Sequence, residues 1–198
     1  MRRISFIKMF SAIIMLASVN SFIGCSDKDN NYDDDFETGI VVESESLNNC
    51  PDNNHPHMID LGLPSGKLWS CCNVGAGSPE QFGDFYSWES ISTELNAPNA
   101  ENVKEFIENT TRKWIKGNGV KGMKFTSKVN GHSIFIPASG IKFSDGIYNK
   151  KEEAGYYWTT SLSKYTSDRA NNLLFVYKSI NIQANPTKFG MNIRPVSK

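Results

Sequence analysis

The chain has 198 residues, with 21 basic and 21 acidic side chains, and 12% of its residues are aromatic. A net charge of zero, with no stripe of Lys and Arg between aromatic residues, excludes the usual classes of nucleic-acid-binding protein. The length and the aromatic content suit one domain with one hydrophobic core, preceded by a shorter N-terminal region.

The first 24 residues have the pattern of a lipoprotein signal peptide. Three basic residues precede an apolar run from about Met9 to Ala17, and Gly24 stands directly before Cys25. The apolar run is shorter than the roughly 20 residues that a membrane-spanning helix requires. We therefore predict that residues 1–24 are removed and that Cys25 carries the acyl chains, palmitate among them, that anchor the protein to a membrane.

An acidic segment follows the anchor. Residues 26–45 carry eight acidic side chains and one base. Such a composition buries too little apolar surface to offset its chain entropy, so we predict that residues 25–54 form a disordered tether. The acids begin directly after Cys25, and this arrangement resembles the export signal of lipoproteins that reach the outer face of the outer membrane. The resemblance implies an outer-membrane protein that faces the extracellular side.

Three further cysteines and two neighbouring histidines flank the end of this segment. Disulfides form outside the inner membrane, so Cys50 is able to pair with Cys71 or, most simply, Cys72, and the unbridged state remains equally open. If the segment is extended, Cys71 and Cys72 point to opposite faces. His55 and His57 do not match the spacing of a closed zinc site. We expect them to be exposed, and we expect no metal and no cofactor.

Short apolar runs, separated by Gly, Pro and Asn, predict strands in the rest of the chain. An Asn130-Gly131 turn joins two of them and predicts a hairpin. The predicted strands are Met58–Leu61, Lys67–Val74, Phe85–Trp88, Lys113–Ile115, Gly122–Lys128, His132–Ile136, Gly155–Ser161, Asn172–Tyr177, Ser179–Ala184 and Met191–Pro195.

One segment, Ala100–Thr110, has the period of a helix. Asn99 suits the N-cap position, and Val103, Phe106 and Ile107 recur on one face. We expect this face to pack on a sheet that contains Trp69 and Trp158. One amphipathic helix among many short antiparallel strands and long loops predicts an α+β fold for residues 55–198.

Four ordered motifs, the first of them in two segments, then carry a resemblance to a known family. They are similar to the Fib_succ_major-type paralogous domain, which implies a C-type-lectin-like fold related to that of formylglycine-generating enzyme. The stretch between Glu89 and Trp114 is shorter than in that family and lacks its helix-start motif. The matching segments read IDLGLPSGKLWSCCNVGA (59–76), FGDFYSWE (82–89), SIFIPASG (133–140), GYYWTTS (155–161) and GMNIRPV (190–196).

The lectin-like resemblance implies a surface module that binds a glycan or a protein through its loops. The aromatic and polar residues around the loop at 142–153 are the expected contacts: Lys142, Phe143, Tyr148 and Tyr156. The alternative is a structural or assembly component of an envelope complex. We do not expect an enzyme, because the sequence shows no nucleophile with a base and an orienting group.

Overall fold

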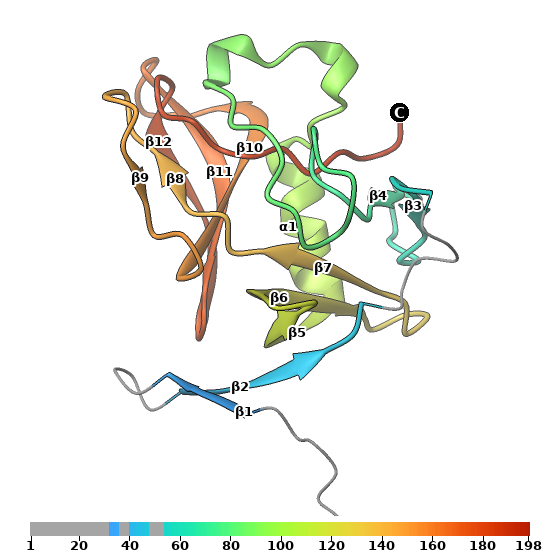
Figure 1. The fold of residues 1–198 in the computed structure, drawn as a ribbon. Coiled ribbons are helices and arrows are strands. Elements are labelled where there is room, and N and C mark those ends of the chain that lie inside the picture. The colour runs from blue at the N-terminus through green and yellow to red at the C-terminus, as the bar shows by residue number, and fades with distance from the viewer. Residues whose placement is uncertain (1–31, 36–39, 48–53) are drawn as a thin grey trace, which may run out of the picture. The chain divides into compact units, whose positions relative to one another are not determined.

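The computed structural model describes residues 32–35, 40–47 and 54–198, which form strands, two short 3-10 helices and one α-helix (Figure 1). Every described residue belongs to one compact unit, Asn31–Lys198. No described helix is long and apolar enough to span a membrane.

The strands form two larger sheets and two short ribbons. The five-stranded sheet has the order β1-β2-β5-β6-β7, in which only β2 and β5 run parallel, and the three-stranded sheet β10-β11-β12 is antiparallel. β3 pairs with β4, and β8 pairs with β9. The bounds are β1 (Tyr32–Asp35), β2 (Ile40–Glu45), β3 (Met58–Ile59), β4 (Trp69–Ser70), β5 (Thr110–Gly117), β6 (Val120–Ser127), β7 (Ser133–Pro137), β8 (Ile141–Lys142), β9 (Tyr148–Asn149), β10 (Ala154–Leu162), β11 (Arg169–Val176) and β12 (Ser179–Pro186).

The helix α1 (Ala100–Asn109) confirms the predicted helical segment almost to the residue. Its N-terminus is closed by a reciprocal pair: Asn102 N donates to Asn99 Oδ1 at 2.7 Å, and Asn99 N donates to Asn102 Oδ1 at 3.1 Å. At its other end, Thr110 Oγ1 donates to the carbonyl of Phe106, and the chain turns directly into β5. The helix contacts strands of both larger sheets.

The core consists of two hydrophobic clusters. Phe106 stacks on Trp69 in the first cluster, with ring centroids 4.3 Å apart, and both side chains are buried. Trp158 belongs to the second cluster, with Met191 and Ile193. The expectation of one sheet that holds both tryptophans under α1 is therefore wrong: Trp69 lies on β4 of a two-stranded ribbon and stacks on Phe106, whereas Trp158 lies on β10 of the three-stranded sheet, which α1 also contacts.

The α+β class and the β6–β7 hairpin at Asn130-Gly131 are confirmed. Two predicted strands are not: Phe85–Trp88 and Met191–Pro195 contribute only isolated bridges, among them Tyr86 with Met191, and a 3-10 helix (Trp88–Ser90) begins within the first. A second 3-10 helix (Thr93–Leu95) follows. The segments Phe85–Trp88 and Met191–Pro195 hydrogen-bond to each other across loops rather than within a sheet.

The prediction of a disordered tether over residues 25–54 is wrong where β1 and β2 form. β2 begins with Ile40-Val41-Val42, a β-branched run that favours a strand, and it pairs with β5. Glu45 lies between two lysines, with Lys124 Nζ at 2.6 Å and Lys113 Nζ at 2.9 Å. Two of the acidic residues that indicated disorder, Glu43 and Glu45, therefore have basic partners on β5 and β6.

Partial burial raises the pKa of Glu45, but the hydrogen bonds from Lys124 and Lys113 outweigh this effect, so the pKa lies below its ordinary value. A carboxylate with a depressed pKa stabilises the folded state above the pKa of the unfolded chain, and this contribution is lost as the pH falls through the folded pKa. The attachment of β2 to the sheet is therefore sensitive to acid.

Candidate ligand-binding site

An aromatic hollow of about 510 Å³ lies between the two larger sheets. We define it by Trp114 on β5, Tyr156 on β10 and Tyr177 directly after β11. Val42 of β2 and Val176 of β11 add apolar surface to its lining. A concave site with aromatic and aliphatic walls is the usual form of a small-ligand site.

Strand alternation explains how these rings come together. On β5, Ile115 is buried in the core while Trp114, its neighbour, is half-buried and lines the hollow. On β11, Phe175 is buried, and the edge of its ring faces Trp114 with centroids 6.3 Å apart. Tyr177 then occupies the two-residue turn that joins β11 to β12, where it also meets Trp114 edge to face at 6.4 Å.

Charged residues line the same hollow. Lys150 and Glu153 form an ion pair at 2.7 Å, and Lys178 Nζ lies 5.4 Å from the centroid of the Tyr177 ring. Burial raises the pKa of Tyr156, and this effect exceeds the opposing attraction of Lys150. The Tyr156 hydroxyl therefore keeps its proton at neutral pH and can donate a hydrogen bond to a ligand.

The predicted contact residues divide between two places. Tyr156 lines the aromatic hollow, whereas Lys142 and Phe143 line a second hollow of about 390 Å³. Tyr148 belongs with this second hollow, because its ring lies 5.1 Å from that of Phe85 and 5.3 Å from Lys142 Nζ. The four residues therefore do not form one contact surface.

Trp114 and Tyr177 were not among the predicted contacts. A signal for Tyr177 was present in the sequence, because Tyr177 ends one predicted strand and only Lys178 separates it from the next, which indicates a tight turn. In the structure, Tyr177 and Lys178 form that turn. The position of Trp114 depends on the pairing of β5 with β2 and on the approach of β11, which are contacts between distant parts of the chain. No pattern in the neighbouring sequence predicts these long-range contacts.

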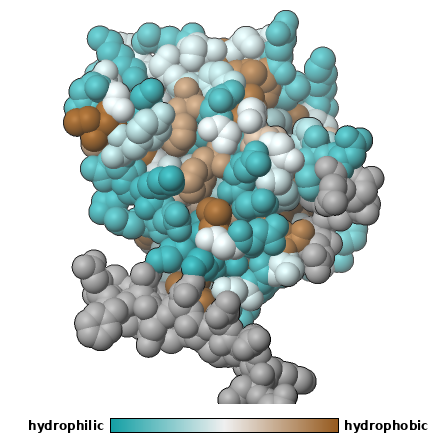
Figure 2. Space-filling model, viewed as in Figure 1, coloured by the Kyte–Doolittle hydropathy of each residue, from teal (hydrophilic) through white to brown (hydrophobic). Residues whose placement is uncertain are grey.

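Figure 2 shows hydrophilic residues over most of the face in view, with hydrophobic residues in small, separate spots. Among the described residues, the exposed large hydrophobic side chains include Ile147, Tyr148 and Tyr165, each on a loop or at a strand end. Scattered residues of this kind are normal on soluble surfaces, whereas a broad apolar patch would indicate a large protein interface.

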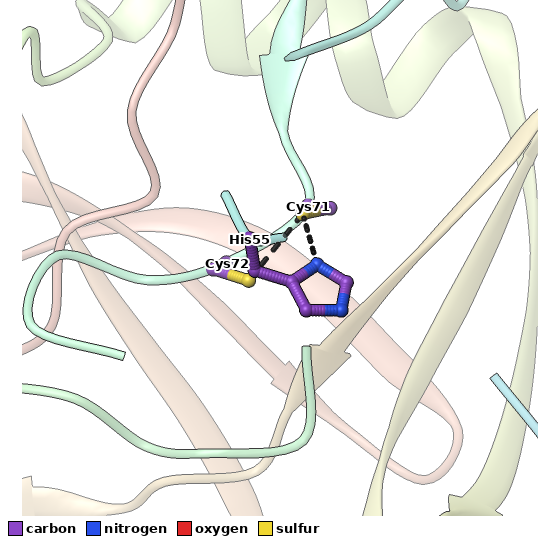
Figure 3. A group of neighbouring side chains, drawn as sticks. All are labelled: His55, Cys71 and Cys72. Atoms are coloured by element: carbon purple, nitrogen blue, oxygen red, sulfur yellow. Dashed lines mark hydrogen bonds between the residues drawn. The ribbon is translucent and has the colours of Figure 1, made fainter. Parts of the chain in front are cut away.

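The second group of functional side chains is the cluster His55, Cys71 and Cys72, drawn in Figure 3. His55 Nδ1 lies 3.5 Å from Cys71 Sγ, and the two sulfur atoms lie 3.3 Å apart. The expectation that the two cysteines point to opposite faces is wrong: both are buried, because the chain bends directly after β4 rather than continuing as a strand.

His55 and His57 are half-buried and not exposed as predicted, and their rings meet at 5.3 Å. His132 is exposed. Cys25 and Cys50 lie outside the described residues, so lipidation at Cys25 and a bridge from Cys50 to Cys72 remain predictions.

Comparisons of the chain with protein-family models, with curated proteins and with solved structures found no match.

Proposed function

We propose that the protein is a lipoprotein, anchored through Cys25 to the outer membrane and facing the extracellular side, whose folded domain is a non-catalytic binding module for a glycan. The acidic segment after Cys25 supports export to the cell surface, and the motif resemblance supports a C-type-lectin-like form of the α+β fold. The ligand would bind in the aromatic hollow.

One observation carries this proposal: three partly exposed aromatic rings, two of which carry a hydroxyl group able to donate a hydrogen bond, surround a concave surface. Sugar rings present apolar C–H faces and hydroxyl edges, so they suit sites where aromatic faces lie beside polar groups. Trp114 and Tyr177 provide the faces, and Tyr156 provides the hydroxyl donor.

The charged rim adds a preference among sugars. Three lysines line the hollow together with two glutamates, and one of those glutamates already pairs with Lys150. A sugar acid or a sulfated sugar would approach Lys178 at the open turn, where the ammonium group lies beside the Tyr177 ring. We therefore expect acidic glycans to bind more tightly than neutral ones at low salt.

The alternative is a structural or assembly component that contacts another envelope protein. The β8–β9 hairpin favours it, because Ile147 and Tyr148 are 60% and 55% exposed at its end and Lys142 lies against the Tyr148 ring. An exposed aromatic and an exposed aliphatic side chain on one hairpin can serve as an anchor for a protein partner.

A glycan array and an outer-membrane extract separate the two functions. The purified mature lipoprotein, solubilised in detergent, is applied to an array of neutral, uronic-acid and sulfated sugars, and the same sample is used to capture proteins from the extract. We expect signals on acidic sugars that weaken as salt is added. An empty array, together with a single captured protein whose capture depends on Tyr148, would support the assembly function instead.

A further inference from the structure

We propose that His55, Cys71 and Cys72 form a binding site for Zn²⁺. The three donors come from two segments that are separated in sequence: His55 precedes β3, and the cysteines follow β4 (Figure 3). Their Nδ1 and Sγ atoms all lie within 4.8 Å of one another. Two cysteines and one histidine are a known ligand set for zinc, in which a fourth position remains for water or another donor.

Two of the three separations between the donor atoms are close to those around a tetrahedral ion. With Zn–S bonds of about 2.3 Å and a Zn–N bond of about 2.0 Å, tetrahedral angles place S and N about 3.5 Å apart and two S atoms about 3.8 Å apart. The observed separations are 3.5 Å from His55 Nδ1 to Cys71 Sγ and 3.3 Å between the sulfurs. The third separation, from His55 Nδ1 to Cys72 Sγ, is at most 4.8 Å, and the two sulfurs must move apart by about 0.5 Å to reach the tetrahedral spacing. A linear two-thiolate ion such as Cu⁺ would need the sulfurs on opposite sides of the metal, considerably further apart.

The surroundings favour the thiolate form, which is the form that binds metal. The backbone N–H of His57 donates to Cys71 Sγ at 3.0 Å. Arg194 is buried and carries its charge close to both sulfurs. Its guanidinium donates to the carbonyls of Ser70 and Phe135, and no carboxylate among the described residues pairs with it.

A buried guanidinium without a carboxylate is costly unless another anion lies near it. Metal binding would convert Cys71 and Cys72 to thiolates, and these anions would then lie near the guanidinium. The two sulfurs would then bind the metal ion together. His55 would complete the ligand set from the solvent side, since its ring is only half-buried.

The site would fasten the N-terminal lead-in to the domain. His55 belongs to the segment that leads from the membrane anchor, and the cysteines belong to the loop after β4, which is buried in the core. A bound ion joins the two without any change to the aromatic hollow, so this proposal is independent of the proposed function. It replaces the expectation that the protein holds no metal.

The test uses the mature lipoprotein in detergent, stripped with a chelator and then incubated separately with Zn²⁺ or with Cu⁺ under reducing conditions. Bound metal is measured after desalting, and affinity by competition with a chromogenic chelator. We expect about one Zn²⁺ per chain, with affinity lowered at least about tenfold in His55→Ala. His132→Ala is the matched control, because His132 is exposed and lies outside the cluster, and it should bind as the wild type does.

A thiol count distinguishes the site from a disulfide. After denaturation with a chelator and alkylation without reductant, three thiols are expected, from Cys50, Cys71 and Cys72. A count of one thiol would show a disulfide bridge and overturn the proposal. Three results of the metal-binding test would also overturn it: unchanged affinity in His55→Ala, binding of Cu⁺ alone, or no bound metal although all thiols are reduced. Circular dichroism of each variant confirms that a loss of metal is not a loss of fold.

Discussion

Replacement of Phe106 by Ala should remove the contact that holds α1 to the core. The Phe106 ring is completely buried, stacks on Trp69 at 4.3 Å and meets Phe125 at 4.7 Å. Truncation of a buried Phe to Ala costs about 3–5 kcal/mol of unfolding free energy, because the lost apolar contact adds to the cost of the cavity.

For a domain of this size, each kcal/mol lowers the melting temperature by about 2–4 °C, so Phe106→Ala should lower it by about 6–20 °C. Thermal unfolding followed by circular dichroism measures the shift. Lys104→Ala on the exposed face of the same helix removes only an exposed ion pair with Glu108, so it should change stability by about 0.5 kcal/mol or less. Equal melting temperatures for the two variants would refute the packing described for α1.

Three other predictions concern the anchor, the export segment and the attachment of β2. Cys25→Ala should abolish incorporation of a fatty-acid analogue in metabolic labelling; equal labelling of both forms would show that the anchor lies elsewhere. Replacement of the acids after the anchor by Ala should leave the protein in the membrane but protect it from protease added to intact cells, provided that the wild type is digested; the residues are Asp27, Asp29, Asp33, Asp34 and Asp35. Glu45→Gln should destabilise the protein at pH 7 but have little effect near pH 3, because the depressed pKa of Glu45 contributes stability only above its titration range, and chemical unfolding at the two pH values measures the difference. An equal destabilisation at both pH values would show that the ion pairs of Glu45 with Lys113 and Lys124 do not stabilise β2.

The elements with strong local signals were predictable from the sequence. α1 carries an N-cap at Asn99 and a regular apolar spacing, and the β6–β7 hairpin carries an Asn-Gly turn, so both follow from interactions between near neighbours. β2 was not predicted, because an acidic composition favours disorder when the basic residues that pair with it in the fold are not known. Its ion pairs with Lys113 and Lys124 join residues about 70 positions apart, and composition alone does not reveal such contacts.

The sites were less predictable than the fold, for the same physical reason. The aromatic hollow needs β2, β5, β10 and β11 in their final positions before Trp114 and Tyr177 meet. The cluster of His55 with Cys71 and Cys72 depends on a bend after β4 that turns both sulfurs inward, where strand alternation predicted one inside and one outside. Both sites are products of tertiary contacts that the spacing of residues does not encode.

The most direct test of the binding function compares three tyrosine or tryptophan variants on the same glycan array. Trp114→Ala and Tyr177→Ala each remove a ring from the aromatic hollow, whereas Tyr165→Ala removes a ring that is 95% exposed and does not line the hollow. We predict that binding to acidic sugars falls at least about tenfold in the first two variants and is unchanged in the third. Undiminished binding by Trp114→Ala and Tyr177→Ala, with all variants folded, would contradict the assignment of the aromatic hollow as the glycan site.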